Sequence, residues 1–247
     1  MVRYLITFSY DGSGFSGFQK QKDKRTIQEE LENALTKINN GEKTEVFASG
    51  RTDKGVHALN QKAHFDLNIK ITEEKLKMAL NSNLPNDIYV KEVLVVEDDF
   101  HARYMVEAKE YMYIMNIGEY NPLERNYIYQ YNKKLDVVAM ERALKYLEGE
   151  HNFKSFSPSD DNNDNYVRTI SQTNLIRDFK NPNLITINFL GSGFLRHMIR
   201  TMIGTLILVG EGKKKPEEII EIIKKEDRRS AGPTCSPEGL YLKNVFY

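Results

Sequence analysis

Residues 50–58, GRTDKGVHA, hold the densest set of reactive side chains in the chain. Asp53 stands between Arg51 and Lys54, and neighbouring cations favour the ionised form of a carboxylate. The two glycines allow a sharp bend that would present Asp53 at the tip of a loop. A carboxylate held in this way could act as a nucleophile. A salt-bridged surface turn is the alternative that the spacing leaves open.

A second group of candidates lies in residues 194–200, FLRHMIR, where an apolar segment carries cations. Arg196 and Arg200 are spaced by one helical turn, which predicts that they share a helix face. The predicted helix is apolar nearly all round, which favours a central, buried position. Because an unpaired buried charge is costly, each arginine needs a structural carboxylate or a substrate phosphate. Asp53 is a candidate partner of Arg200.

Gly12, Gly14 and Gly17 match the G-x-G-x-x-G pattern of dinucleotide sites and follow a predicted strand. In such a site a helix must begin within the motif, so that its amide groups point at the pyrophosphate. Residues 18–25 are instead polar and basic without apolar periodicity, and the next helix is predicted to begin only at Thr26. The pattern therefore favours a flexible turn over a nucleotide-dependent enzyme.

Aromatic and imidazole side chains complete the candidates. Residues 109–113, KEYMY, place Tyr111 and Tyr113 on one face of a predicted strand. Such tyrosines usually belong to the core, but one that lines a cleft could stack on a nucleic-acid base. The five histidines show no metal-ligand spacing of the H-E-x-x-H kind, so no metal site is expected.

Composition indicates an ordinary globular chain of 247 residues, with 40% apolar and 28% charged residues. Its one cysteine, Cys235, excludes a disulfide framework and favours a reducing, cytosolic location. The net charge of zero means that nucleic-acid binding would depend on a local basic face. No signal peptide or membrane span is expected, because the most apolar segment, 194–209, is short and contains two arginines.

The elements that would position these groups follow the order strand, helix, strand, strand, helix, strand, and a second half repeats it loosely. In the first half, strands are predicted at residues 4–10, 46–48, 63–67 and 88–96, with helices capped by Thr26 and Thr72. In the second half, strands are predicted at residues 107–117, 174–177, 184–189 and 240–246, with helices capped by Asp136 and ending near Gly149, following Phe194, and opening at Pro216. A mobile loop is predicted at residues 155–166.

This order is that of ferredoxin-like domains. The expected fold is therefore α+β, with halves at residues 1–104 and 105–247. The two halves would join into one large, mainly antiparallel sheet with helices packed on it and a central cleft.

Taken together, the motifs resemble those of the tRNA pseudouridine synthase A family over essentially the whole chain. The segment 50–58 resembles the family's catalytic loop and is the most specific of them. The others occur in the family's order, at residues 10–19, 83–85, 99–103, 109–113, 151–153, 194–204 and 239–240.

The resemblance implies a pseudouridine synthase fold and an isomerase that converts uridine to pseudouridine at tRNA positions 38–40, on the 3′ side of the anticodon stem-loop. Asp53 would be the nucleophile, and Arg200 would pair with it. Tyr111 would stack on the target uracil, and Arg51 would help to extrude that base. The resemblance further implies a cytoplasmic homodimer that needs no cofactor and no metal.

Two features depart from the family pattern. Arg196 stands where many relatives have tyrosine, and Cys235 begins a Cys-Ser-Pro run in place of a more usual Ala-Pro-Pro. These departures leave two alternatives open. One is a paralogue that acts on another RNA, such as ribosomal RNA, and the other is a non-catalytic RNA-binding or chaperone module on the same fold.

Overall fold

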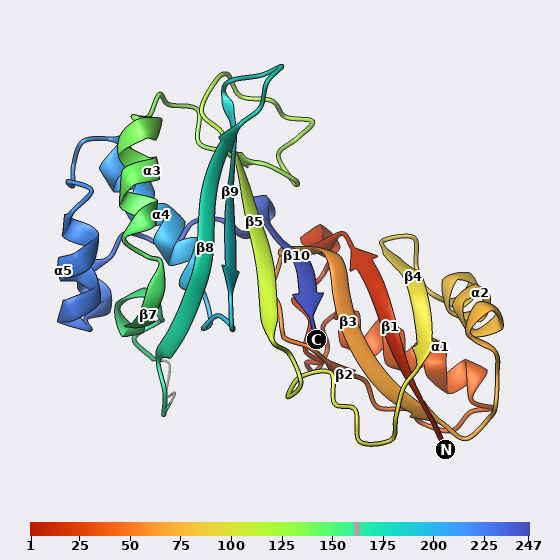
Figure 1. The fold of residues 1–247 in the computed structure, drawn as a ribbon. Coiled ribbons are helices and arrows are strands. Elements are labelled where there is room, and N and C mark those ends of the chain that lie inside the picture. The colour runs from red at the N-terminus through yellow and green to blue at the C-terminus, as the bar shows by residue number, and fades with distance from the viewer. Residues whose placement is uncertain (161–163) are drawn as a thin grey trace. The chain divides into compact units, whose positions relative to one another are not determined.

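The computed structural model describes residues 1–160 and 164–247. Contacts divide the chain into two compact units, one of residues 1–107 with 241–247 and the other of residues 108–240. The α+β class is confirmed, and antiparallel pairing prevails within each unit (Figure 1). The halves 1–104 and 105–247 stay a prediction. No helix in the described part of the chain is both long and apolar enough to cross a membrane.

The first unit has the predicted order of elements. They are β1 (Val2–Tyr10), α1 (Ile27–Ile38), β2 (Phe47–Ala48), β3 (His57–Leu67), α2 (Glu73–Asn83) and β4 (Ile88–Val95). β1 lies between β4 and β3 and is antiparallel to both. The short β2 pairs with β3, and the closing strand β10 (Leu240–Phe246) adds to β3 in parallel (Figure 1).

Local signals explain these elements. Tyr4, Ile6 and Phe8 alternate along β1 and are fully buried, so they form the core face of the strand. The hydroxyl of Thr26 accepts the N–H of Glu29 at 3.4 Å and thereby caps α1, as predicted. The apolar stripe of α1 is buried, which holds the helix on the unit's core.

The second unit contains a four-stranded antiparallel path, β5-β9-β8-β7, with β6 added to β5. Its helices α3 and α4 pack on each other (Figure 1), and Arg142 of α3 pairs with Glu217, directly before α5, at 2.9 Å. As predicted, α4 is buried nearly all round. The bounds are β5 (Ala108–Asn116), β6 (Tyr129–Gln130), α3 (Val137–Lys145), β7 (Gly149–Asn152), β8 (Val167–Arg177), β9 (Leu184–Gly191), α4 (Met198–Gly210) and α5 (Glu218–Lys225).

Three expectations for the second unit differ from the structure or lie partly outside it. Gly149 does not end the helix capped by Asp136, because that helix ends at Lys145 and Gly149, with φ of +107°, begins β7. β8 spans residues 167–177 and is longer than the predicted 174–177. The prediction was too short because the largely exposed side chains of β8 show little apolar alternation. The loop predicted at 155–166 includes residues 161–163, which lie outside the described residues.

His64 is a buried imidazole of the first unit, only 2% exposed. Its Nδ1 accepts the N–H of Ala102 at 3.1 Å, so this nitrogen carries no proton. Burial lowers the pKa of His64 to about 4, and the charges of His101 and Arg3 act in the same direction. The ring is therefore neutral in the folded protein at pH 6.5, the ordinary pKa of histidine.

We expect the free energy of unfolding to fall as the pH decreases from 6.5 to about 4. In that window the unfolded chain takes up a proton on His64 and the folded chain does not. The loss amounts to at most about 3 kcal/mol. Urea unfolding of the wild type and of His64→Gln across this range provides the measurement. The stability advantage of the wild type should shrink toward pH 4, and an advantage that stays constant with pH would contradict the prediction.

Candidate active site

The segment 50–58 joins β2 to β3 in the first unit, as predicted. The N–H of Val56 donates to the carbonyl of Asp53 at 3.2 Å, and Gly55 adopts a φ of +79°. This tight turn leaves the Asp53 side chain half-buried, while Arg51 and Lys54 are exposed. The carboxylate is thus held at a tight turn, with Arg51 and Lys54 close to it in sequence.

Thr52 ties the loop to two neighbouring segments. Its buried hydroxyl lies 2.8 Å from the hydroxyl of Tyr10 at the end of β1, and its carbonyl accepts the N–H of Phe18 at 3.1 Å. Burial raises the pKa of Tyr10 to about 12, so the phenol stays protonated at neutral pH. The residue directly before Asp53 is therefore fixed through both its side chain and its backbone.

The beginning of the loop is fixed to β3 through Gln61, which is fully buried. The side-chain amide of Gln61 donates to the carbonyl of Gly50 at 3.0 Å, and its oxygen accepts the Ser49 hydroxyl at 2.6 Å. Since a buried amide that lost these partners would be costly, this network holds the loop in one position.

The glycines at 12 and 17 serve the same loop by letting the backbone come close. A Cβ added at Gly12 would lie 2.0 Å from the carbonyl oxygen of Val56, and one at Gly17 would lie 3.0 Å from that of Thr52. Gly17 also has a φ of +98°. Gly12 to Gly14 form only a single 3-10 turn, and the next helix begins at Ile27, so the helix that a pyrophosphate site requires does not open there.

His57, the first residue of β3, contacts both Gly12 and the strand β10. Its Nδ1 accepts the N–H of Gly12 at 3.0 Å, and its ring stacks on Tyr241 of β10 with 4.6 Å between the centroids. The carboxylate of Asp11 lies 3.3 Å from the same nitrogen. Because an amide N–H can only donate, that nitrogen is unprotonated, so Asp11 and His57 do not form a charged pair through it.

Tyr10 and Gln61 support the loop but are not among the site residues predicted from the sequence. A signal was present, because each places a polar group on the buried face of its strand, where it needs a partner. Which partner each would find depends on strand pairing, of β1 with β3 for Tyr10 and of β2 with β3 for Gln61, and neither segment specifies that pairing alone.

Tyr111 lies on β5 in the second unit and is 8% exposed. Its ring meets that of Phe194 edge to face, with 5.2 Å between the centroids and 80° between the planes. Phe189 lies opposite it on β9. The ring is therefore preorganised by its aromatic contact with Phe194.

Arg200 lies in the first turn of α4 and is half-buried. Its Nε donates to the carbonyl of Cys235 at 2.7 Å, and the N–H of Cys235 donates to the carbonyl of Arg200 at 3.1 Å. One hydrogen bond thus attaches the guanidinium to Cys235, and a second joins the backbones of the two residues.

The expectation that Arg196 and Arg200 share a helix face is wrong. α4 begins at Met198, because His197 takes the left-handed conformation with a φ of +58° and interrupts the helical path. Arg196 precedes the helix, is exposed, and pairs with Asp160 at 2.5 Å.

Tyr113, next on the same face as Tyr111, has a structural position. It is fully buried, and its hydroxyl donates to the carbonyl of Ser236 at 2.8 Å. Burial raises its pKa well above the ordinary value. The four predicted site residues thus form two pairs: Arg51 and Asp53 share one loop of the first unit, whereas Tyr111 and Arg200 belong to the second.

Comparisons with known proteins cover nearly the whole chain. A family model described as tRNA pseudouridine synthase matches residues 6–105 and 143–247. A protein of Streptococcus pneumoniae strain P1031 named tRNA pseudouridine synthase A is 46% identical over 248 residues, covering 100% of this chain and 99% of that protein. Its namesake from serotype 19F (strain G54) is 45% identical with the same coverage.

Among solved structures, one titled as a Cbf5-Nop10-Gar1 complex covers 82% of this chain and 54% of that chain, at 12% identity and a TM-score of 0.34. The sequence comparisons are far closer than this one, and they include the segments that carry Arg51, Asp53 and Arg200. On their evidence, the chain belongs to the tRNA pseudouridine synthase family.

Proposed function

We propose that this protein isomerises uridine to pseudouridine in tRNA, with Asp53 as the nucleophile. The observation that carries the proposal is 46% identity, over the entire chain, to a protein named tRNA pseudouridine synthase A. The local geometry supports the choice of Asp53. It is a half-buried carboxylate in a loop whose residues Gly50 and Thr52 are fixed by hydrogen bonds.

The reaction breaks the C1′–N1 glycosidic bond, turns the uracil, and joins C5 to C1′. The hydrogen on C5 leaves as a proton and N1 gains one, so no electrons are exchanged and no water is consumed. A carboxylate can serve this chemistry by attacking C1′, by attacking C6, or by stabilising positive charge at C1′ while the base is eliminated. All three routes need an ionised Asp53.

The other proposed roles follow from the need to take the base out of its stack, which costs a few kcal/mol. Tyr111 stacks on the extruded uracil, Arg51 assists the extrusion, and Arg200 pairs with Asp53. The exposure of Arg51 and the preorganised ring of Tyr111 support the first two assignments. The anchoring of Arg200 to Cys235 supports the third, because an anchored cation holds its charge in one place.

The proposed target is the 3′ side of the anticodon stem-loop, at positions 38–40, and the proposed assembly is a cytoplasmic homodimer. These assignments rest on the family alone. Light scattering of the purified protein tests the assembly, since a dimer has twice the mass of one chain.

Pseudouridine mapping tests the function. Unmodified tRNA transcripts are incubated with the protein, labelled with carbodiimide and analysed by primer extension. New stops on the 3′ side of the anticodon arm are expected. Stops only on ribosomal RNA would favour the paralogue. An absence of stops on both RNAs would favour a non-catalytic RNA-binding module.

Two substitutions of Tyr111 separate stacking from the phenol hydroxyl. Tyr111→Phe keeps the ring, so its kcat is expected to stay within about threefold of the wild type. Tyr111→Ala loses a stacking interaction of about 1–3 kcal/mol, which corresponds to a decrease in kcat of about 5- to 150-fold. Tritium release from tRNA labelled at uridine C5 measures both, below the melting temperature of the alanine variant. Equal rates for the two variants would exclude a stacking role.

A further inference from the structure

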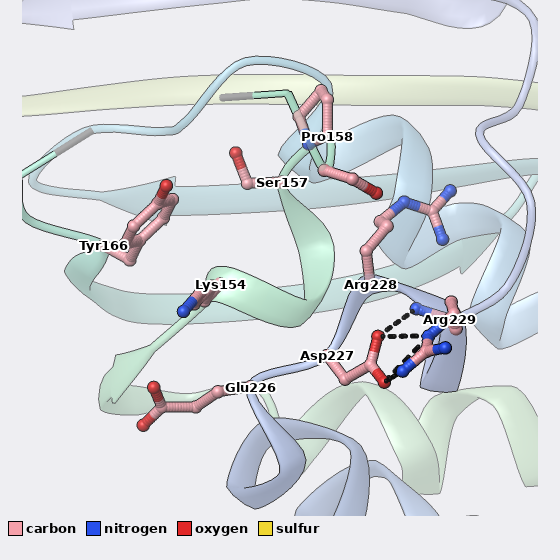
Figure 2. A pocket seen from close by; sticks show the side chains of 9 residues that line it. Lys154, Ser157, Pro158, Tyr166, Glu226, Asp227, Arg228 and Arg229 are labelled. Carbon is pink, nitrogen blue, oxygen red and sulfur yellow. Dashed lines mark hydrogen bonds and ion pairs between the residues drawn. The ribbon is translucent and has the colours of Figure 1, made fainter. Parts of the chain in front are cut away.

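A hollow on the second unit is lined on one side by Arg228 and Arg229, which have different surroundings. Figure 2 shows Arg229 joined to Asp227 by dashed lines, while the guanidinium of Arg228 points away from that carboxylate. The Nε and Nη2 atoms of Arg229 lie 2.8–3.1 Å from the Asp227 carboxylate oxygens, and Arg229 is exposed. Arg228 is half-buried, and its hydrogen bonds go to residues 232 and 234.

The contacts of Arg228 lead to the segment that anchors Arg200. Its Nη1 donates to the carbonyl of Gly232 at 2.9 Å, and its Nη2 donates to the hydroxyl of Thr234 at 3.1 Å. The next residue is Cys235, whose carbonyl accepts from Arg200. We call residues 231–236 the Arg200 strap.

The strap lies directly on α4. A Cβ added at Gly204 of α4 would lie 1.8 Å from the carbonyl oxygen of Pro233. The N–H of Gly232 donates to the hydroxyl of Thr205 at 2.9 Å. The hydroxyls of Thr234 and Thr201 lie 3.1 Å apart. The strap therefore lies on the helix that carries Arg200, and its position determines where the Cys235 carbonyl holds the Arg200 guanidinium.

Arg228 is the charged donor in this arrangement. Hydrogen bonds from a charged group contribute more than those between neutral groups. Burial lowers the pKa of Arg228 below its ordinary value, yet the group stays protonated at neutral pH. These two bonds join residue 228 to residues 232 and 234, so they restrict the conformations that the strap can take where it lies on α4.

We propose that Arg228 is a positioning residue, which acts through the Arg200 strap to hold the Arg200 guanidinium in place for the reaction at Asp53. The proposal rests on the proposed function, because it gives Arg200 a role in that reaction. It assigns no substrate contact to Arg228.

The chain contains its own reporter for the strap. Cys235 is the only cysteine, lies within the strap and is 6% exposed. Its thiol should react slowly with a disulfide reagent such as DTNB while the strap lies on α4, because reaction requires an exposed thiolate. The rate of labelling thus measures strap opening without reference to catalysis.

The test compares Arg228→Gln with Arg228→Lys and with the matched control Arg229→Gln. For Arg228→Gln we expect kcat to fall by about tenfold or more, tRNA affinity to stay within about twofold, and Cys235 labelling to be at least about tenfold faster. Arg228→Lys should restore part of kcat. Arg229→Gln should match the wild type in all three measurements, made well below each melting temperature.

Two results would overturn the proposal. One is unchanged kcat in Arg228→Gln despite faster Cys235 labelling. The other is weaker tRNA binding at unchanged kcat, which would make Arg228 an RNA contact. If Arg228→Gln fails to fold, Thr234→Val decides instead. It removes the hydroxyl that Arg228 bonds and should lower kcat more than Thr201→Val, which removes only the other contact of that hydroxyl, whereas Thr234→Ser should retain kcat. Equal kcat for Thr234→Val and Thr234→Ser would overturn the proposal.

The experiment also separates this proposal from the proposed function. If the wild type releases no tritium from tRNA, the proposed function fails. The thiol measurement still decides whether Arg228 holds the strap. Labelling of Cys235 at the wild-type rate in Arg228→Gln would show that it does not.

Discussion

Asp53→Asn is expected to abolish turnover, lowering kcat by about 10⁴-fold or more, which is the scale seen when a nucleophile is removed. Asparagine has nearly the same shape but no charge, so it can neither attack carbon nor stabilise a cationic C1′. The affinity for tRNA should stay within about threefold, because affinity comes mainly from phosphate contacts. Stability should change little, since the loop is held by Thr52 and Gly50.

The measurements are tritium release, a filter-binding titration with tRNA, and a thermal melt. Asp53→Ala should behave like Asp53→Asn. Asp23→Asn is the matched control, because Asp23 is exposed on the same unit and its φ of +57° suits asparagine. Retained turnover in Asp53→Asn would mean that another group is the nucleophile. Lost turnover with equally lost tRNA binding would point to a role in substrate binding.

Gly12→Ala is expected to lower both stability and turnover, although residue 12 carries no reactive group. The added Cβ would lie 2.0 Å from the carbonyl oxygen of Val56, which belongs to the Asp53 loop. The backbone must shift by about 1 Å to relieve this contact. Overpacking of this kind costs about 1–3 kcal/mol. A displacement of about 1 Å near a reacting group can lower the rate by about 100-fold.

Gly14→Ala is the matched control, since it makes the same change within the same 3-10 turn. Its Cβ would meet the ends of two flexible side chains, at 3.2 Å from Arg25 and 3.6 Å from Asp87, which can move aside. Urea unfolding and tritium release on both variants provide the comparison. Wild-type stability and turnover in Gly12→Ala would show that the approach of residue 12 to the Asp53 loop is not required.

Strong local patterns made much of the fold predictable. The alternation along β1 predicted its buried face, and the hydroxyl of Thr26 predicted where α1 begins, because both effects act between residues close in sequence. The nearly unbroken apolar character of α4 predicted its burial. The prediction was wrong at the start of α4, where His197 adopts a left-handed conformation that no spacing rule anticipates.

The sequence by itself determined the composition of the candidate site. It identified the Asp53 loop, Tyr111 and Arg200, and it showed that residues 12–17 lack the helix start of a nucleotide site. Only the tertiary structure decided how these groups are held. Gly12 meets Val56, Tyr10 meets Thr52, and Arg228 meets the strap that carries Cys235. The contact between Tyr10 and Thr52 spans 42 positions, and such contacts depend on strand register and backbone approach, which no local pattern encodes.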